Sequence, residues 1–386
     1  MTGSGFVLVR LALVQIPFVT GSFLLVWVAL LLAQPLAPAV WGGLPLALLM
    51  AGTWAASSPA AAISRRWGSK RGTVLGVFLG VAGASGVVAA LSLGSFPLLC
   101  AAYFVYGLHR ACLVSLDALA SGALSSRGPS VLLIGTLAGA ILGPALGYWG
   151  RGGTIPFAAS FGLLLGGMAV QAVVAATLPD VRREETSRIG LSHRPWGQRL
   201  ADPALWLAAG APALSSGLVV LFLAVLPLAM REHGHPLSSS TLVLQAFGLG
   251  VCASRVISSR LWKRWEARRL MAWGIVLFAA ASLTSWAGTD LWPFAVALTL
   301  LGFGWNLLLV GGASLLAKVH RPTENTGVQV FRDSLVYGFA AVASLGAGLG
   351  ERTLGWSGLQ LLTIPILGVL VVLLLVNRSP KKPVDS

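Results

Sequence analysis

Residues 11–64 read LALVQIPFVTGSFLLVWVALLLAQPLAPAVWGGLPLALLMAGTWAASSPAAAIS and contain neither Asp, Glu, Lys nor Arg. This run is long enough for two apolar segments of about 20 residues, the length of helix that crosses a lipid bilayer. Pro35 and Pro38 lie between the two segments, where they indicate a turn. A second uncharged run, residues 72–109, is divided by Gly94-Ser95-Phe96-Pro97. The pattern predicts successive membrane-spanning helices.

The composition of the whole chain agrees with this interpretation. Of 386 residues, 56% are hydrophobic and 10% are charged, whereas a soluble domain has roughly a quarter of its residues charged. Three widely spaced cysteines exclude a disulfide-rich secreted scaffold. The apolar segments are continuous rather than alternating, which excludes a membrane β-barrel. We therefore expect an all-α polytopic membrane protein.

Hydropathy and helix-breaking residues together predict twelve transmembrane helices. They are placed at residues 11–34, 40–63, 72–94, 97–121, 130–150, 155–178, 204–230, 238–257, 270–288, 292–317, 328–350 and 355–377. The positive residues indicate the orientation, because 24 of the 27 Lys and Arg fall on one side of this arrangement. We expect a multi-pass protein of the cell inner (cytoplasmic) membrane with both termini cytoplasmic.

The net charge of +15 would suggest nucleic-acid binding in a soluble domain. In a membrane protein the same charge marks the cytoplasmic face, which meets the anionic lipids of the inner leaflet. The expected partners are therefore the bilayer and a small-molecule substrate, without nucleic acid, and we expect a monomer. The first apolar segment lacks the cleavage site of a signal peptide.

An internal repeat divides the chain. The polar stretch 179–203 lies at its midpoint and is expected to be a cytoplasmic linker. Two loops, RRWGSKR at residues 65–71 and KRWEARR at 263–269, share the pattern basic-basic-Trp-x-x-basic-basic. We therefore predict a six-helix half at 1–178, a second six-helix half at 204–377 and a cytoplasmic tail at 378–386. Transporters built from such parallel repeats bind substrate near the midplane, between the halves.

Twelve spans with a basic loop between the second and third resemble the major facilitator superfamily. Its loop motif, Gly-x-x-x-Asp-Arg-x-Gly-Arg-Lys, aligns with residues 61–70, where Arg66, Gly68 and Lys70 match, whereas Ala61 replaces the leading Gly and Arg65 replaces the Asp. The resemblance covers nearly the whole chain and implies a two-half fold with alternating access. It also implies a gating role for loop residues, namely Arg65, Arg66, Gly68 and Lys70 and, in the second loop, Arg264 and Arg268.

The fifth span contains GAILGPALG at residues 139–147, which is similar to the Gly-x-x-x-Gly-Pro motif of the superfamily's antiporters. Gly139, Gly143 and Gly147 recur at every fourth residue, so they form a ridge against which another helix can pack closely. Pro144 can bend the span. Packing and hinge interpretations are both open. Residues 302–356, with Gly304-Trp305-Asn306 and Phe331-Arg332-Asp333, also resemble a bacterial branch of the superfamily.

Ionisable residues inside spans are costly and usually face the bundle interior or a water-filled cavity. Asp117 follows His109 and Arg110 by eight and seven residues, roughly on one helical face. One interpretation makes Asp117 a proton site tuned by the two residues; the other places it in a cytoplasmic extension of the span. Asp333, beside Arg332, is either part of an ion pair that gates the halves, with Arg127 or Arg255, or a charge at a helix start.

Uncharged polar residues within the spans are candidates to line a substrate cavity, because buried hydroxyls and amides need hydrogen-bond partners. They are Gln15, Thr20, Ser215, Ser216, Gln245 and Asn306. Charged residues are scarce in the first, second, seventh and eighth spans, where Arg255 is the exception. A neutral, moderately lipophilic organic solute suits such a cavity.

Motifs of other function classes are missing from the sequence. It has no nucleotide-binding phosphate loop and no hydrolase or metalloprotease motif, so we expect neither an enzyme nor a cofactor. Glu232-His233-Gly234-His235 contains metal-ligand residue types, but too few for a site, and we expect no metal.

The sequence predicts a secondary active transporter that exports a small neutral or lipophilic solute in exchange for a proton, an efflux antiporter. Two alternatives stay open. One is a proton-coupled importer or a facilitator of a small nutrient in the same fold. The other is an assembly factor or sensor that has the fold without transporting, because Arg65 replaces the usual acidic residue.

Overall fold

The computed structural model describes residues 3–122, 128–178, 196–261, 265–319 and 325–377. Its long helices are α1 (Gly3–Ala33), α2 (Leu44–Trp67), α3 (Ser69–Leu93), α4 (Phe96–Gly122), α5 (Gly128–Trp149), α6 (Ala158–Ala176), α8 (Pro203–Glu232), α9 (Leu237–Leu261), α10 (Ala267–Trp286), α11 (Leu291–Val319), α12 (Asn325–Leu361) and α13 (Thr363–Val376). Two short helices, η1 (Ala39–Trp41) and α7 (Trp196–Leu200), join them. The expected all-helical fold is confirmed.

The last two spans follow one another without a loop. Residues 327–376 form one apolar stretch of 50 residues, one of 11 candidate spans among the described residues. At 1.5 Å per residue such a helix would be ~75 Å long, more than twice a bilayer core. The helix is interrupted at Gly355, where φ of +63° and ψ of −178° turn the chain back. This left-handed conformation favours glycine, and it divides the stretch into the eleventh and twelfth spans.

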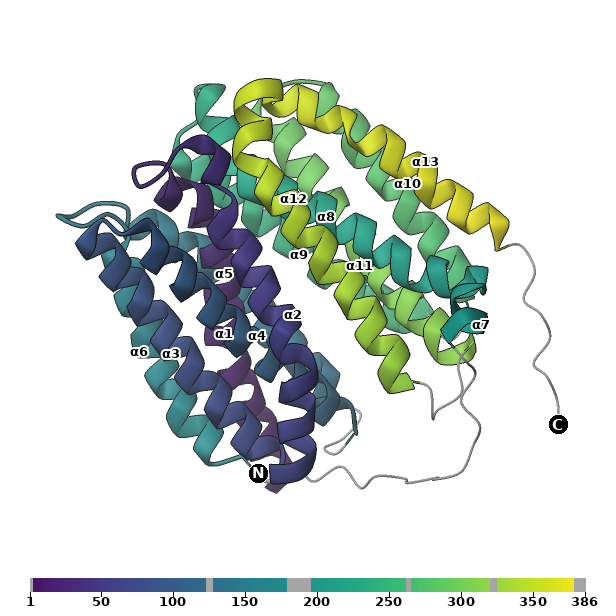
Figure 1. Ribbon diagram of the computed structural model, residues 1–386, viewed down its shortest axis with the longest axis horizontal. Coiled ribbons are helices and arrows are strands. Elements are labelled where there is room, and N and C mark those ends of the chain that lie inside the picture. Colours follow the sequence, from purple (N-terminus) through teal and green to yellow (C-terminus); the bar gives the residue numbers. More distant parts are fainter. Residues whose placement is uncertain (1–2, 123–127, 179–195, 262–264, 320–324, 378–386) are drawn as a thin grey trace.

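The two halves pack in matching ways (Figure 1). In the first half α1 packs on α5, α2 on α4, and α3 on both α4 and α6; in the second half α8 packs on α12, α9 on α11, and α10 on both α11 and α13. Each pair has its counterpart six spans further along the chain. The Trp-containing loops occupy matching places too, since Trp67 ends α2 and Trp265 precedes α10.

The start of α8 shows how the sequence sets the boundary of a helix that is buried along most of its length. Asp202 accepts a hydrogen bond from the backbone N–H of Ala204 at 2.9 Å, and Pro203 occupies the first helical turn. This is the usual chemistry of a helix N-terminus. Nearly all side chains of α8 are buried inside the protein, as expected for a helix that is apolar on every face.

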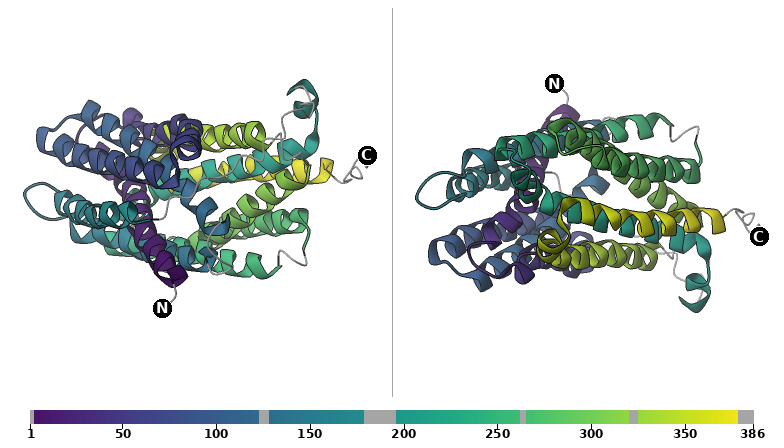
Figure 2. Two further views of the ribbon diagram at one scale, coloured as in Figure 1. Left: turned by 90° about the horizontal axis from the view of Figure 1, so that it is seen from below. Right: turned by 90° about the horizontal axis from the view of Figure 1, so that it is seen from above.

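The halves meet through three sets of helices: α2 with α12, α5 with α9, and α1 with α8. We name the face with the start of α1 and the end of α13 the termini face, and the other side the far face. Gly43 and Gly348 make close contacts between α12 and the segment before α2, near the far face. Figure 1 shows the ribbons of α2 and α12 closest there and spreading apart toward the termini face. The same two-lobed arrangement is seen from above and below (Figure 2).

Candidate transport site between the two halves

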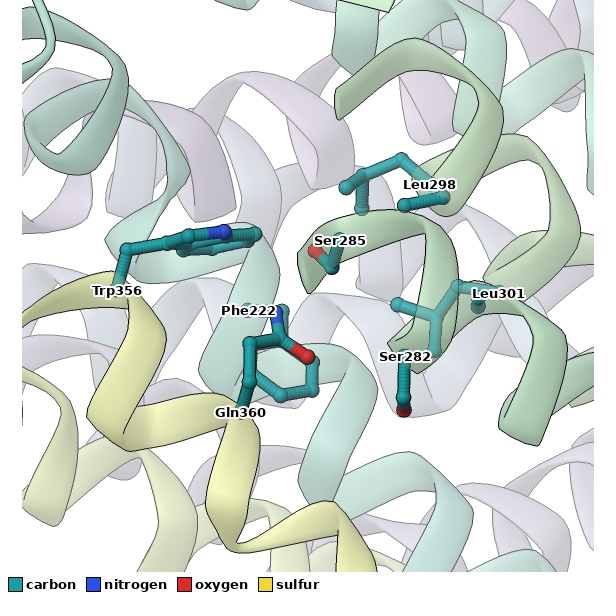
Figure 3. A pocket seen from close by; sticks show the side chains of 9 residues that line it. Phe222, Ser282, Ser285, Leu298, Leu301, Trp356 and Gln360 are labelled. Atoms are coloured by element: carbon teal, nitrogen blue, oxygen red, sulfur yellow. The ribbon is translucent and has the colours of Figure 1, made fainter. Parts of the chain in front are cut away.

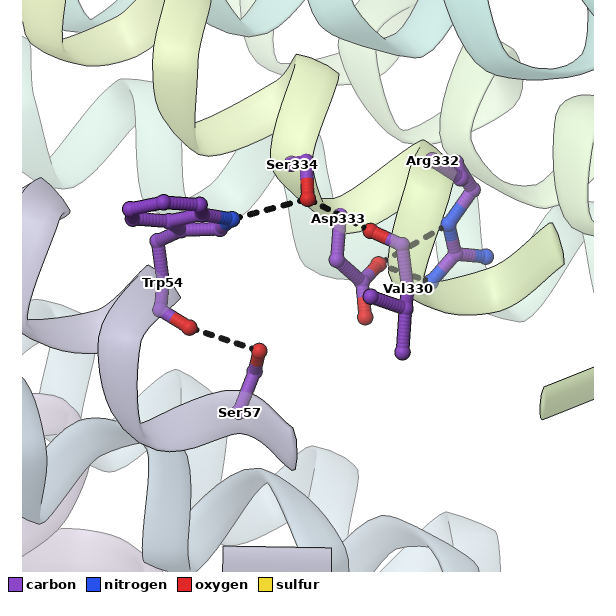
Figure 4. Close-up of polar contacts among 6 residues, drawn as sticks. All are labelled: Trp54, Ser57, Val330, Arg332, Asp333 and Ser334. Carbon is purple, nitrogen blue, oxygen red and sulfur yellow. Dashed lines mark hydrogen bonds and ion pairs between the residues drawn. The ribbon is translucent and has the colours of Figure 1, made fainter. Parts of the chain in front are cut away.

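Two hydrogen bonds connect the halves part-way along the helices. Trp54 of α2 donates its indole N–H to the Ser334 hydroxyl of α12 at 2.7 Å, and Figure 4 shows this bond reaching across the interface. Gln245 of α9 donates from its amide nitrogen to the Ile141 carbonyl of α5 at 2.9 Å. These contacts lie at the interface of the two halves, which is therefore the candidate location of a shared site.

Aromatic side chains from both halves gather in this region. The rings of Phe23 on α1 and Phe247 on α9 are 6.3 Å apart between centroids, and Phe247 is 6.0 Å from Trp305 on α11. The Trp305 indole donates to the Ser216 hydroxyl of α8 at 2.9 Å. Phe23 and Trp305 are half-buried, so part of their surface is open to another molecule. Flat ring systems stack favourably on such groups.

A cationic residue lies at a similar depth. Arg110 of α4 is half-buried, and its Nε and Nη1 atoms are enclosed without a hydrogen-bond partner. Tyr337, on α12 in the other half, lies near enough to interact electrostatically with Arg110, as does Tyr106 one turn earlier on α4. The interface therefore combines aromatic rings, uncharged donors and the partly unpaired guanidinium of Arg110.

The predicted proton-site residues lie in different surroundings. His109 is buried inside the first half, where its Nδ1 atom lies 2.7 Å from the Gly76 carbonyl oxygen and its ring contacts Phe18 and Tyr106. Asp117 is helical, but its side chain lies outside the described residues. The proton role predicted for these residues stays a prediction.

The carboxylate of Asp333 forms an ion pair with Arg332, the preceding residue in the sequence. Arg332 donates from Nη2 and Nε to the Asp333 carboxylate at 2.7 and 3.0 Å (Figure 4), and both side chains are about a quarter exposed. Arg127 lies outside the described residues, and Arg255 is half-buried on α9. The geometry gives a pair within one helix rather than a bond between the halves.

The other predicted cavity residues mostly bond within one half. Gln15 donates to the Thr136 hydroxyl at 3.4 Å, Ser215 to the Pro212 carbonyl at 3.0 Å, and Asn306 to the Ser254 hydroxyl at 3.1 Å. Thr20 is buried and its hydroxyl lacks a partner. Gln245 is therefore the member of this group that bonds across the interface, whereas Ser216 bonds Trp305 within the second half.

The glycine ridge of α5 packs on α1. A Cβ atom on Gly139 would lie 2.6 Å from Val19 Cβ, one on Gly143 would lie 2.6 Å from the Thr20 carbonyl oxygen, and one on Gly147 would meet the Trp27 ring. Pro144 lies inside the same helix. The ridge thus allows the two helices that flank the interface to approach each other closely.

The predicted gating-loop residues are only partly described. Gly68 connects α2 to α3 with a φ of +89°, Arg66 is exposed and Lys70 is half-buried. The side chains of Arg65 and Arg264 lie outside the described residues. Arg268 donates from Nη2 to the Leu374 carbonyl at 2.7 Å and so fastens α10 to α13.

A separate small pocket lies inside the second half (Figure 3). It is lined by Phe222, Ala281, Ser282, Ser285, Ala297, Leu298, Leu301, Trp356 and Gln360 and has room for about one water-sized molecule. The indole nitrogen of Trp356 and the hydroxyl of Ser285 lack partners there. A bound water could satisfy these groups, whereas an organic solute could not enter.

The two histidines considered as metal ligands hold the turn after α8. His233 Nδ1 lies 2.8 Å from the Ala229 carbonyl oxygen, and His235 Nε2 lies 2.7 Å from that of Thr289. Both rings contact Phe294. Among the described residues no group of three or more potential ligands gathers for a metal ion.

The sequence search missed the aromatic residues of the interface, Phe23, Trp54, Phe247, Trp305 and Tyr337. A usable signal existed for Trp305, since it lies between Gly304 and Asn306 in a motif already noted. The others are ordinary residues of apolar spans, and only the packing of the two halves brings them together.

A polytopic membrane protein with two matching six-helix halves around a shared interface has the architecture of a secondary transporter. Comparison with known proteins supports this class. The model of the Major Facilitator Superfamily matches residues 213–386. The riboflavin transporter RfnT of Brucella anthropi is 31% identical over 350 residues, covering 88% of this chain and 87% of the relative. The chain belongs to the major facilitator superfamily.

Two further comparisons agree. The uncharacterized transporter YdeG of Bacillus subtilis is 25% identical over 377 residues, covering 90% of this chain and 85% of the relative. A crystal structure of a mutant of the nucleoside transporter NupG covers 96% of this chain and 98% of its own, with a TM-score of 0.71 and 12% identity. At that identity the likeness concerns the fold alone.

Proposed function

We propose that this chain is a secondary transporter of riboflavin or a closely related neutral flavin, moved across the membrane by alternating access. The observation that carries the proposal is the 31% identity to a riboflavin transporter along 88% of this chain. An alignment of this extent must include most of both halves.

The chemistry of the interface supports a flavin. Riboflavin is an uncharged molecule with a flat three-ring system and a chain of hydroxyl groups. Phe23 and Trp305, which are half-buried and both contact the buried ring of Phe247, offer aromatic surfaces for the ring system. The side chains of Ser216 and Gln245, at the same interface, are of the kind that bonds hydroxyl groups. The proposal keeps the neutral solute of the sequence-based prediction and replaces its lipophilic character with an amphipathic one.

For the direction of transport we favour uptake, the nutrient-importer alternative, over export. The support is that riboflavin is a vitamin that cells gain by importing. The Lys and Arg distribution favours cytoplasmic termini, so the termini face would be the inner face. With close contacts between α12 and the segment before α2 near the far face, the structure then corresponds to an inward-facing state. A membrane transporter of this kind needs no catalytic residue.

The proposal can be tested in a bacterial strain that neither synthesises riboflavin nor has a transporter for it. Expression of this chain should permit growth at riboflavin concentrations that do not support the strain with an empty vector. Growth that stays at the empty-vector level, despite protein in the membrane, would contradict the proposed substrate. A stable protein partner together with an absence of flux for any solute would favour the alternative of a non-transporting sensor.

A further inference from the structure

Arg110 and Tyr337 face each other near the middle of the molecule, one from each half. Arg110 is 14 residues from the start of α4, which begins at the far face, so it lies about 21 Å into a helix of 27 residues. Tyr337 is 12 residues from the start of α12, about 18 Å from the termini face. Both depths are near the midplane, where transporters with this repeat bind their substrates.

Two nitrogens of the Arg110 guanidinium lack a hydrogen-bond partner among the residues that the structure describes. Its Nε and Nη1 atoms are enclosed without a hydrogen bond, and a buried charge is costly unless it is paired or bonded. The described groups that act on it electrostatically include Tyr106 and Tyr337, both phenols, and the neighbouring His109. The nearby carboxylate of Asp333 is held by Arg332. The Nε and Nη1 atoms of Arg110 therefore need a hydrogen-bond acceptor, which a bound ligand could supply.

The aromatic group lies at a comparable depth. Trp305 is 14 residues into α11, which also begins at the far face, and so lies about 21 Å along that helix, as Arg110 does along α4. A flat ring system held against Phe23 and Trp305, the half-buried members of the aromatic group, would extend within the same layer as the guanidinium. This arrangement suits a molecule with one apolar ring end and one acceptor-rich end.

Resting on the proposed function, we propose that Arg110 binds the dioxopyrimidine ring of the flavin, donating hydrogen bonds to its carbonyl oxygen and ring nitrogen, while the Tyr337 hydroxyl contacts the same edge. The planar guanidinium presents several donors in a fixed fork, which matches two neighbouring acceptors. The dimethylbenzene end of the flavin would then point toward the aromatic residues. Arg110 is thus a specificity-determining residue that distinguishes flavins from other flat amphipathic solutes.

Binding of flavins to the purified full-length protein tests this assignment. Quenching of riboflavin fluorescence gives its affinity, and competition gives that of 2-thioriboflavin, whose sulfur is a weaker acceptor than the carbonyl oxygen it replaces. The wild type should prefer riboflavin. Arg110→Met should weaken riboflavin binding by roughly 10- to 100-fold, the range for hydrogen bonds to a charged group, and should abolish the preference over the thio analogue.

Three further variants control the experiment. Arg110→Lys keeps the charge but loses the fork, so it should fall between wild type and Arg110→Met. Tyr337→Phe should reduce the preference over the thio analogue, which keeps the test decisive if Arg110→Met fails to fold. Arg268→Met removes a guanidinium that fastens α10 to α13 and should leave the preference unchanged.

The outcomes separate the two proposals. Binding of riboflavin by the wild type, with an unchanged preference in Arg110→Lys and Tyr337→Phe, would overturn the role of Arg110 and leave the flavin substrate intact. Failure of the wild type to bind any flavin would contradict the proposed function and, with it, this inference.

Discussion

Trp54 is the residue that most directly connects the two halves near their middle, through its 2.7 Å bond to Ser334. Its side chain is nevertheless half exposed. A hydrogen bond of this kind contributes about 1 kcal/mol, which corresponds to roughly a fivefold change in a two-state equilibrium. The bond therefore biases the molecule toward the described state without fixing it there.

We predict that Trp54→Phe, which keeps the ring and removes the donor, shifts the population toward the state closed at the termini face. Spin labels at the exposed positions Ser58 on α2 and Gln329 on α12 should report more short distances. Trp292→Phe, at a Trp that is 76% exposed, serves as the matched control. An unchanged distance distribution in Trp54→Phe would show that the bond does not influence the equilibrium.

Asp117 remains the residue predicted to carry a proton. If it does, Asp117→Asn should abolish riboflavin-dependent proton movement in liposomes that contain a pH-sensitive dye, while riboflavin exchange persists. Asp333→Asn is the comparison, because that carboxylate is already paired with Arg332. Proton movement that survives in Asp117→Asn would contradict the assignment.

Single residues were the least predictable part of the site. Polarity within an apolar span identified Gln15, Asn306 and Ser216 alike. All three find partners on neighbouring helices of their own half, but the partner of Ser216 is Trp305, whose ring contacts Phe247 next to the other half. Which way a polar side chain points depends on helix rotation, and that is set by packing across the whole bundle rather than by local sequence.

At the scale of elements, the contact of α5 with α1 depends on the absence of side chains. Gly143 lies so close to Thr20 and Phe23 that added Cβ atoms would fall within 2.8 Å of both. Close packing of small residues is a main source of helix association in membranes. The ridge recognised from the sequence therefore lies at a tight helix–helix contact.

We predict that Gly143→Ala lowers the melting temperature of the purified protein by several degrees, because an overpacked contact costs about 1–3 kcal/mol. Gly162→Ala on α6 is the matched control, since nothing lies within 4 Å of a Cβ atom there. Alanine favours a helix over glycine by about 1 kcal/mol, so that variant should be neutral or more stable. Equal melting temperatures for both variants would disprove the packing role.

The helices themselves were largely predictable, because long uncharged segments separated by Pro, Gly and basic residues leave few alternatives in a membrane. The boundaries of the helices were less predictable. The first helix begins at Gly3 rather than near residue 11, and the last two spans are separated by a turn at Gly355 rather than by a loop. The amphipathic ends of helices and the tight turns between them leave weaker signals in the sequence than the apolar middle parts of the spans do.

At the scale of the whole molecule, the far face is closed by α12 meeting the segment before α2. A Cβ atom on Gly348 would lie 2.5 Å from the Ala39 carbonyl oxygen, whereas nothing lies within 4 Å of one on Gly346, two residues earlier. The two glycines thus form a natural comparison between a position inside the contact and one outside it.

We predict that Gly348→Ala separates the halves at the far face, while Gly346→Ala leaves them as in the wild type. Spin labels at the exposed residues Ser92 and Asp290, one in each half, should show longer distances only in Gly348→Ala. Equal distances in the two variants would mean that this contact does not close the far face.

Counterflow in liposomes is the simplest test of riboflavin transport, because it requires a carrier for riboflavin but neither a proton gradient nor a known direction of transport. Vesicles with the purified protein are loaded with unlabelled riboflavin and diluted into a trace of radiolabelled riboflavin. We predict that label accumulates transiently above its equilibrium level and that protein-free vesicles show no such overshoot. Label that enters no faster than in protein-free vesicles would show that this chain does not carry riboflavin.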